Sequence, residues 1–179
     1  MASRTLEALW RATDHGRLPV VCDASSCTHG LEQLAQALPE QDRARYEALR
    51  FTDSVTFTRE HVLPALPALP EARRVRSLAL HPTCSTVHLG ITGDLRALAE
   101  AVAAEVTVPD AWGCCAFAGD RGLLHPEVTA AATSAQAAEV NRASYDAYAS
   151  CNLTCEIGMS RATGKPYRHI LEILADAVG

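Results

Sequence analysis

No apolar run in the sequence approaches the roughly 20 residues that a membrane-spanning helix needs. The N-terminus also lacks the basic segment followed by an apolar one that marks a secretory signal peptide. We therefore expect a cytoplasmic protein that is not transmembrane. Apolar residues still make up 48% of the chain and charged residues 21%, which is typical of a globular protein with a real core.

Clustered basic charge and common catalytic motifs are scarce as well. The formal net charge is −5, and only Arg73, Arg74 and Arg76 lie together, directly before a predicted strand. A solvated approach to that strand explains them better than phosphate binding, so we expect no nucleic-acid partner. No Gly-x-Gly-x-x-Gly loop, Walker loop or Gly-x-Ser-x-Gly elbow is present, which excludes the most familiar nucleotide-binding and hydrolase sites.

The residues that are present alternate between short apolar runs and amphipathic segments. This alternation predicts an α/β fold with small parallel sheets flanked by helices. The expected strands are 18–22, 75–80, 105–108 and 145–149. The expected helices are 4–13, 27–37, 42–49, 54–63, 92–104, 126–132, 134–143, 154–162 and 168–177. Three prolines within 64–74 indicate a linker between a smaller N-terminal piece and a larger C-terminal one.

Cysteine is the most informative residue type. The chain has seven cysteines, an odd number, and disulfides are uncommon in the cytoplasm, so metal binding or redox chemistry is the better expectation. The C-terminal piece contains Cys84, Cys114, Cys115, Cys151 and Cys155. Cys84 and Cys155 each follow a predicted strand where a helix begins, and the adjacent pair lies in a glycine-flanked loop. Loops beyond the carboxyl ends of parallel strands meet, so these thiols are expected to converge.

The adjacent pair Cys114-Cys115 favours a metal. Neighbouring Cα atoms lie about 3.8 Å apart, whereas unstrained disulfides need about 4.4–6.8 Å. A metal ion or iron cluster can accept both thiolates and offset their mutual repulsion. The helix N-terminus at Cys155 also favours its thiolate, by about 0.3–1 kcal/mol.

Other interpretations remain open at several positions. Cys22 lies inside an apolar strand and is better explained as a small buried hydrophobe. Cys151 forms a Cys-x₃-Cys spacing with Cys155, which can place two ligands one helical turn apart but is not the tight Cys-x₂-Cys of ferredoxins. His81 precedes Cys84 and could bind metal or donate to a sulfur, although a histidine that merely ends a strand is the favoured interpretation. Four thiolates suit structural zinc as well as iron, and a metal-free redox-sensing thiol protein is a third alternative.

Three segments resemble a known family: 81–85, with His-Pro-Thr-Cys-Ser; 114–127, which begins Cys-Cys-Ala-Phe-Ala-Gly-Asp-Arg-Gly; and 154–167, which includes Arg-Ala-Thr-Gly-Lys-Pro-Tyr. They are similar to the cysteine-rich CCG domain at the C-terminus of FAD-linked, iron–sulfur D-lactate dehydrogenases. Heterodisulfide reductases and the iron–sulfur subunits of glycolate and glycerol-3-phosphate oxidation systems carry the same type of domain. The resemblance covers most of residues 18–175.

The resemblance implies a domain division and a ligand set. Such domains carry two repeats, and residues 67–179 match the second, with Cys84, Cys114, Cys115 and Cys155 as ligands. Residues 1–66 would be the remnant of a first repeat, whose closing motif resembles 20–27 and places Cys27 in a separate half-site. We therefore expect the chain to be a fragment that begins inside the first repeat.

The resemblance also implies cofactors and partners. The expected cofactor is an iron–sulfur cluster of the 4Fe-4S or the non-cubane type, with FAD in a part of the parent chain that is not included. Flavin and ferredoxin-like domains would be the partners, and a quinone or cytochrome at the inner face of the membrane the electron acceptor. The parent would oxidise a 2-hydroxy acid such as D-lactate, and the fragment alone would not be catalytic.

Two departures from the family pattern affect the predicted site. Ala116 stands where the family usually has glycine, directly after the cysteine pair. The final motif is Cys151-Asn-Leu-Thr-Cys155 instead of Cys-x₂-Cys. The departures leave open whether the centre resembles a five-thiolate non-cubane cluster or an ordinary four-thiolate one.

Overall fold

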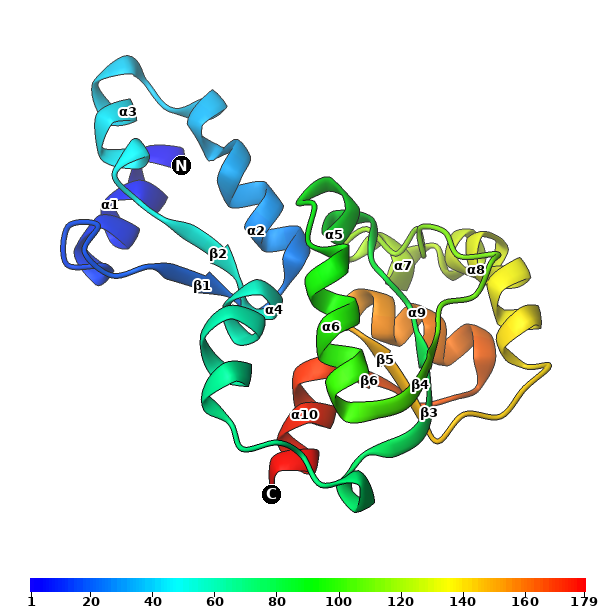
Figure 1. Cartoon of the computed structure of the whole chain (residues 1–179). Coiled ribbons are helices and arrows are strands. Elements are labelled where there is room, and N and C mark those ends of the chain that lie inside the picture. The colour runs from blue at the N-terminus through cyan, green and yellow to red at the C-terminus, as the bar shows by residue number, and fades with distance from the viewer.

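A computed structural model describes all residues from 1 to 179 and shows two parallel sheets, each with its own helices (Figure 1). The smaller sheet pairs β1 (Val20–Cys22) with β2 (Phe51–Asp53). The larger sheet has the order β4-β3-β5-β6, and all its neighbouring strands are parallel. Its strands are β3 (Val75–Leu80), β4 (Ala103–Thr107), β5 (Ala147–Ser150) and β6 (Tyr167–His169). The predicted α/β class is confirmed.

Helices precede, connect and follow the strands. The helices of the N-terminal part are α1 (Ala2–Ala12), α2 (Ser25–Glu32), α3 (Glu40–Glu47) and α4 (Ser54–Phe57). Those of the larger sheet are α5 (Cys84–His88), α6 (Thr92–Val102), α7 (Arg121–Leu124), α8 (Pro126–Val140), α9 (Leu153–Thr163) and α10 (Ile170–Val178). None of these helices combines the length and the apolar character needed to cross a membrane.

The larger sheet is the middle of three layers. Leu78 and Leu80 of β3 point to one face, where they share a fully buried core with residues of α6 and α10 such as Leu98 and Ile170. Ala79 points to the other face, which α8 and α9 cover. This alternation along β3 follows from the period of two residues in a strand. Because both faces are covered, the edges and ends of the sheet are its accessible parts.

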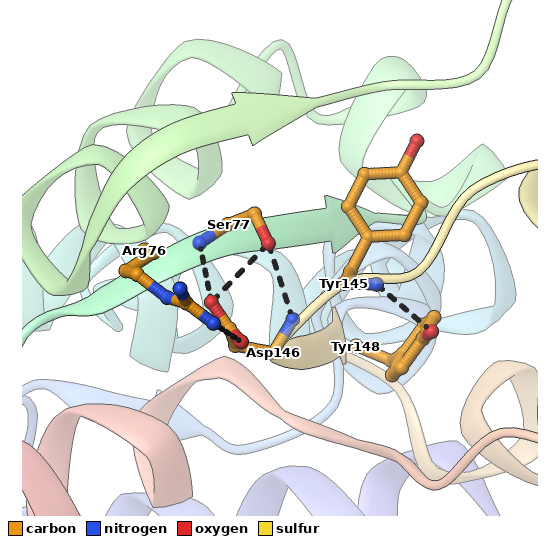
Figure 2. A network of polar contacts seen from close by, with 5 residues as sticks. All are labelled: Arg76, Ser77, Tyr145, Asp146 and Tyr148. Carbon is orange, nitrogen blue, oxygen red and sulfur yellow. Dashed lines mark hydrogen bonds and ion pairs between the residues drawn. The ribbon is translucent and has the colours of Figure 1, made fainter.

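A polar network fixes the register of β3 and β5 at the amino ends of these strands (Figure 2). The Asp146 carboxylate accepts from Ser77 N–H at 3.1 Å, from Ser77 Oγ at 3.3 Å and from Arg76 at 3.2 Å. The Asp146 N–H in turn donates to Ser77. This register also fixes how the carboxyl ends of β3 and β5 are aligned with each other.

The element boundaries differ from the predicted ones at a few places. The predicted helices 126–132 and 134–143 are one helix, α8, because Thr133 and Ser134 donate their hydroxyl hydrogen bonds to the carbonyls of the preceding turn. The predicted helix 168–177 begins later, since residues 167–169 form β6. The three-residue strands β2 and β6 are too short to produce a recognisable apolar alternation.

Candidate metal centre

The carboxyl end of β3 presents the first two candidate residues. The chain leaves Leu80 through His81, whose N–H donates to Ala149 O at 2.8 Å and whose carbonyl accepts from Ser150 Oγ at 2.9 Å. Helix α5 then begins at Cys84, capped by Thr83, whose hydroxyl accepts from Thr86 N–H. The His81 end of this short segment is therefore held against β5, and its Thr83 end is fixed by the capping of α5.

The loop after β4 carries the cysteine pair and is anchored at two points. The Glu139 carboxylate of α8 accepts 2.8 Å hydrogen bonds from the N–H groups of Asp110 and Ala111. The indole of Trp112 donates to Pro82 O at 2.5 Å, which ties the loop to the segment before Cys84. These anchors position Cys114 and Cys115, although the loop has no regular secondary structure up to α7.

Cys155 completes the buried part of the site from the first turn of α9. Its Sγ lies 3.0 Å from Cys115 Sγ, and both residues are buried. The hydrogen bond with Cys155 lowers the pKa of Cys115 to about 5, against the opposing effect of burial. The same hydrogen bond, followed by burial, raises the pKa of Cys155. The pair therefore favours a thiolate at Cys115 beside a thiol at Cys155.

His81 lies against this pair of sulfurs. One nitrogen of its ring and the Sγ atoms of Cys115 and Cys155 all lie within 4.8 Å of one another. The ring is fully buried, and Nδ1 lies 3.0 Å from Gln136 Oε1 on α8. The remaining nitrogen, Nε2, is buried and has no hydrogen-bond partner in the protein. An unpartnered buried nitrogen beside two sulfurs is the strongest sign of a ligand-binding site in the molecule.

Cys84 and Cys114 lie on the exposed side of the same group. Burial is the largest cause of the raised pKa of Cys84. The charge of Cys114 is the second cause, and the charge of Cys115 adds to it. The charge of Cys84 also raises the pKa of Cys155. Cys84 and Cys114 therefore lie on the exposed side of the buried trio of His81, Cys115 and Cys155, and only the trio has donor atoms within 4.8 Å of one another.

Cys151 occupies a different environment. Its Sγ lies 3.9 Å from the hydroxyls of both Ser25 and Thr83, and it is 1% exposed. Burial raises the pKa of Cys151 to about 12, so the thiol stays protonated at neutral pH. Cys151, like Cys84 and Cys114, is not among the donor atoms that lie within 4.8 Å of one another, and its charge, like that of Cys84, raises the pKa of Cys155. The polar neighbours of its sulfur are therefore hydroxyls, whereas Cys155 faces the sulfur of Cys115.

The two cysteines of the N-terminal part lie near each other. Cys22 ends β1 and is buried, while Cys27 is exposed on α2. Burial is the largest cause of the raised pKa of Cys22, and the charge of Cys27 contributes to it. All seven cysteines are free thiols. No further thiol or histidine joins these two in a group that could hold a metal.

Sequence reasoning undervalues one residue of the site and misses another. The sequence favours a strand terminus for His81, and only the fold shows that its ring turns toward the sulfurs. Gln136 gives no signal, because a glutamine in a helix rich in alanine is usually exposed. Its burial to 2% is the unusual feature, and it is visible only once α8 is placed against the sheet.

The fold and the gathered thiols define a cysteine-rich α/β protein with a candidate metal centre at the carboxyl ends of β3 and β5. The strand order reverses between these strands, which is where ligand sites form in open parallel sheets. The donor atoms of Cys115, Cys155 and His81, with the thiols of Cys84 and Cys114 beside them, fit an iron–sulfur cluster or zinc, both of which prefer thiolate and imidazole ligands.

The particular relative found by comparison is the glycolate oxidase iron–sulfur subunit of Escherichia coli (strain K12). The two sequences are 25% identical over 183 residues, which covers 99% of this chain. The chain spans 44% of the length of that relative. No family model matches the chain. The match confirms the resemblance to the cysteine-rich iron–sulfur proteins of FAD-linked oxidases that the cysteine motifs indicated.

Proposed function

We propose that this chain holds an iron–sulfur cluster and transfers electrons within an FAD-linked oxidase of 2-hydroxy acids. The observation that carries the proposal is the cluster of Cys115, Cys155 and His81, whose donor atoms lie within 4.8 Å of one another. Cys84 and Cys114 lie close enough to this cluster for their charges to affect one another. The match to an iron–sulfur subunit supports iron over zinc. D-lactate is the substrate indicated by the sequence motifs and glycolate the one in the name of the relative; both are 2-hydroxy acids.

The four cysteines are proposed as the thiolate ligands, in two roles. Cys115 and Cys155 are buried, so they would shield the inner side of the centre from water. Cys84 and Cys114 are exposed and would form the side through which electrons enter or leave. A bound cluster supplies one-electron redox chemistry, and the burial and hydrogen bonds of its ligands set the reduction potential.

The other parts of the proposal concern the molecular context. Residues 67–179 would form a complete cysteine-rich repeat, and residues 1–66 would contribute Cys27 to a separate half-site. A flavin-containing partner and a ferredoxin-like domain would deliver the electrons, and a quinone or cytochrome would accept them. The cluster would be of the 4Fe-4S or the non-cubane type.

Anaerobic reconstitution with iron and sulfide tests the cluster. We expect the full chain to retain iron and acid-labile sulfide after gel filtration and to give an electron paramagnetic resonance signal in one redox state. Stoichiometric zinc with no retained iron would favour the structural zinc module instead. Reversible oxidation of Cys84 with Cys114 or Cys115, with neither metal retained, would favour the redox-sensing alternative.

An activity measurement tests where the chemistry lies. The reconstituted chain should not oxidise D-lactate or glycolate with a dye acceptor, because the flavin that removes hydride from the substrate is proposed to lie in the partner. Turnover by the chain alone would overturn this assignment.

A further inference from the structure

A hydrogen bond between Gln136 and the Nδ1 side of the ring holds the imidazole of His81 in one orientation. Its Nδ1 lies 3.0 Å from Oε1 of Gln136, and the two residues are 0% and 2% exposed. A carbonyl-type oxygen can only accept a hydrogen bond, so Nδ1 carries the proton and donates. The neutral ring then presents the lone pair of Nε2.

Apart from the Cys115 sulfur, whose pKa the contact with His81 lowers, no group of the protein engages that nitrogen. Nε2 is buried without a hydrogen-bond partner, on the side of the ring opposite Gln136. The donor atoms of Cys115, Cys155 and His81 lie within 4.8 Å of one another. Leaving a buried nitrogen unpaired is unfavourable, and a bond to a metal would remove that cost. A metal-binding histidine usually donates its other N–H to an oxygen in this way.

We infer that His81 Nε2 is itself a metal ligand, so that the centre has mixed nitrogen and sulfur ligation, with Gln136 as the residue that positions the ring. The inference rests on the proposed function only in requiring that the site holds a metal. It differs from the thiolate-only set that the cysteine motifs predict.

Neutral nitrogen ligation changes the charge of the centre. A thiolate brings one negative charge to the metal, whereas the imidazole brings none, so a centre with one histidine is easier to reduce than the same centre with cysteine there. His81→Cys should therefore lower the reduction potential if the variant assembles. If His81 only filled space beside the sulfurs, no coupling between the metal centre and a histidine nitrogen would be observed.

The test uses the full chain reconstituted with iron and sulfide and labelled with ¹⁵N-histidine. Pulsed electron paramagnetic resonance should show a strong coupling to a histidine nitrogen, and X-ray absorption at the iron edge should show the outer-shell scattering of an imidazole ring. Both signals should be lost in His81→Ala. They should persist in His88→Ala, because His88 lies at the end of α5 with its ring stacked on His29.

Gln136 provides a second pair of variants, in case His81→Ala does not fold. Gln136→Glu keeps an oxygen at the position that accepts from Nδ1 and should keep the nitrogen coupling. Gln136→Leu removes that oxygen at similar volume and should weaken metal retention about tenfold or more. Equal retention by the two variants, with unchanged coupling, would overturn the positioning role.

The outcomes separate this inference from the proposed function. Iron retained with sulfur scattering alone would overturn the role of His81 and leave the proposed function standing. Zinc retained in place of iron, with imidazole scattering at the zinc edge that His81→Ala removes, would support His81 and overturn the proposed function. A chain that retains neither metal would contradict both.

Discussion

Ala116 is the clearest case of strain at a single residue. It directly follows Cys115 and has a φ angle of +54°, in the left-handed region that glycine adopts without a steric penalty. An alanine in this region costs about 1–2 kcal/mol. The family pattern has glycine at this position, and the structure gives the physical reason. The loop keeps the conformation because its start is anchored by Glu139 and Trp112 and its end by the hydrogen bond from Gly122 N–H to Phe117 O.

Ala116→Gly should therefore stabilise the protein. We expect the free energy of unfolding to rise by about 1 kcal/mol, because the relief of strain exceeds the added flexibility of glycine in the unfolded chain. Urea denaturation measures it. The control is Ala131→Gly on the exposed face of α8, which should cost about 1 kcal/mol. A similar decrease in the free energy of unfolding in both Ala116→Gly and Ala131→Gly would contradict the strain at Ala116.

Cys151 and Cys155 are separated by only three residues yet should behave differently. Cys155 Sγ lies 3.0 Å from Cys115 Sγ, whereas Cys151 lies among hydroxyls. Cys155→Ser should lose most of the bound iron after reconstitution, and Cys151→Ser should retain it. Iron and sulfide analysis gives the answer directly. Equal iron loss would assign Cys151 to the ligand set and favour a five-thiolate centre.

At the scale of elements, close packing between α7 and the loop before it shapes the site. Gly122 donates its N–H to Phe117 O at 2.7 Å, and an added Cβ at Gly122 would clash with the Phe117 ring. Phe117 is 1% exposed and packs with Cys115 and Cys155, so its ring cannot move away freely. The glycine is thus required by the close approach of this ring and not by a positive φ.

Gly122→Ala should displace Phe117 and with it the cysteine pair. Overpacking of this kind typically costs about 1–3 kcal/mol, and we expect reduced iron retention as well. Gly113→Ala is the matched control, because a Cβ there meets no atom within 4 Å. Thermal unfolding and iron content should change in the first variant only. Normal iron retention by Gly122→Ala would show that the ring yields without moving the thiols.

Two aspartates at element ends should give opposite pH dependences. Burial raises the pKa of Asp53 at the end of β2, while Arg76 lowers the pKa of Asp146 before β5. As pH rises above the ordinary pKa near 4, Asp53 loses its proton in the unfolded chain but keeps it in the folded one. The free energy of unfolding therefore falls with rising pH until the raised folded pKa of Asp53 is passed. Asp146 acts with the opposite sign: its contribution is present above the ordinary pKa and is lost as pH falls through its lower folded pKa.

Substitution by asparagine separates the two effects. Relative to the parent chain, Asp53→Asn should gain stability as pH is raised above about 4, until the raised folded pKa of Asp53 is passed. Asp146→Asn should lose stability relative to the parent at lower pH, as pH is raised from the lowered folded pKa of Asp146 to about 4. Urea denaturation of the metal-free chain at several pH values provides the comparison. The same trend in both variants would contradict the assigned causes.

Elements with a strong pattern are predictable from the sequence, whereas those fixed by distant contacts are not. The apolar run of β3 and the alanine-rich helices are recognisable in the sequence. Because Cys84 and Cys155 each follow a predicted strand, the sequence also predicts that the thiols lie at the carboxyl ends of the strands. The turn of His81 toward them could not be predicted, since it depends on Gln136, which lies 55 positions away and is buried only after α8 packs. The environment of Cys151 also depends on Ser25, 126 positions away.

At the scale of the whole molecule, the N-terminal part meets the larger sheet at two places: Val55 of α4 joins the core of the larger sheet, and a small hydroxyl cluster is formed by Ser25, Thr83 and Ser85. Ser25 Oγ, at the start of α2, lies 2.7 Å from Ser85 Oγ and 3.1 Å from Thr83 Oγ1. All three side chains are buried, and α2 approaches α5 at this place (Figure 1). The junction therefore lies directly beside the helix that begins with Cys84, which couples the position of the smaller sheet to the candidate metal centre.

Ser25→Ala should loosen the smaller sheet without unfolding the larger one. The variant leaves two buried hydroxyls with one partner fewer, at a cost of about 1–3 kcal/mol. Hydrogen exchange should become roughly tenfold faster or more in peptides that cover β1, α2 and β2, while peptides from β3 and β5 stay protected. Ser26→Ala is the control, because Ser26 is exposed and donates only to Asn152. Equal loss of protection in both sheets would mean that the chain unfolds as one cooperative unit, and it would contradict the division between residues 1–66 and 67–179.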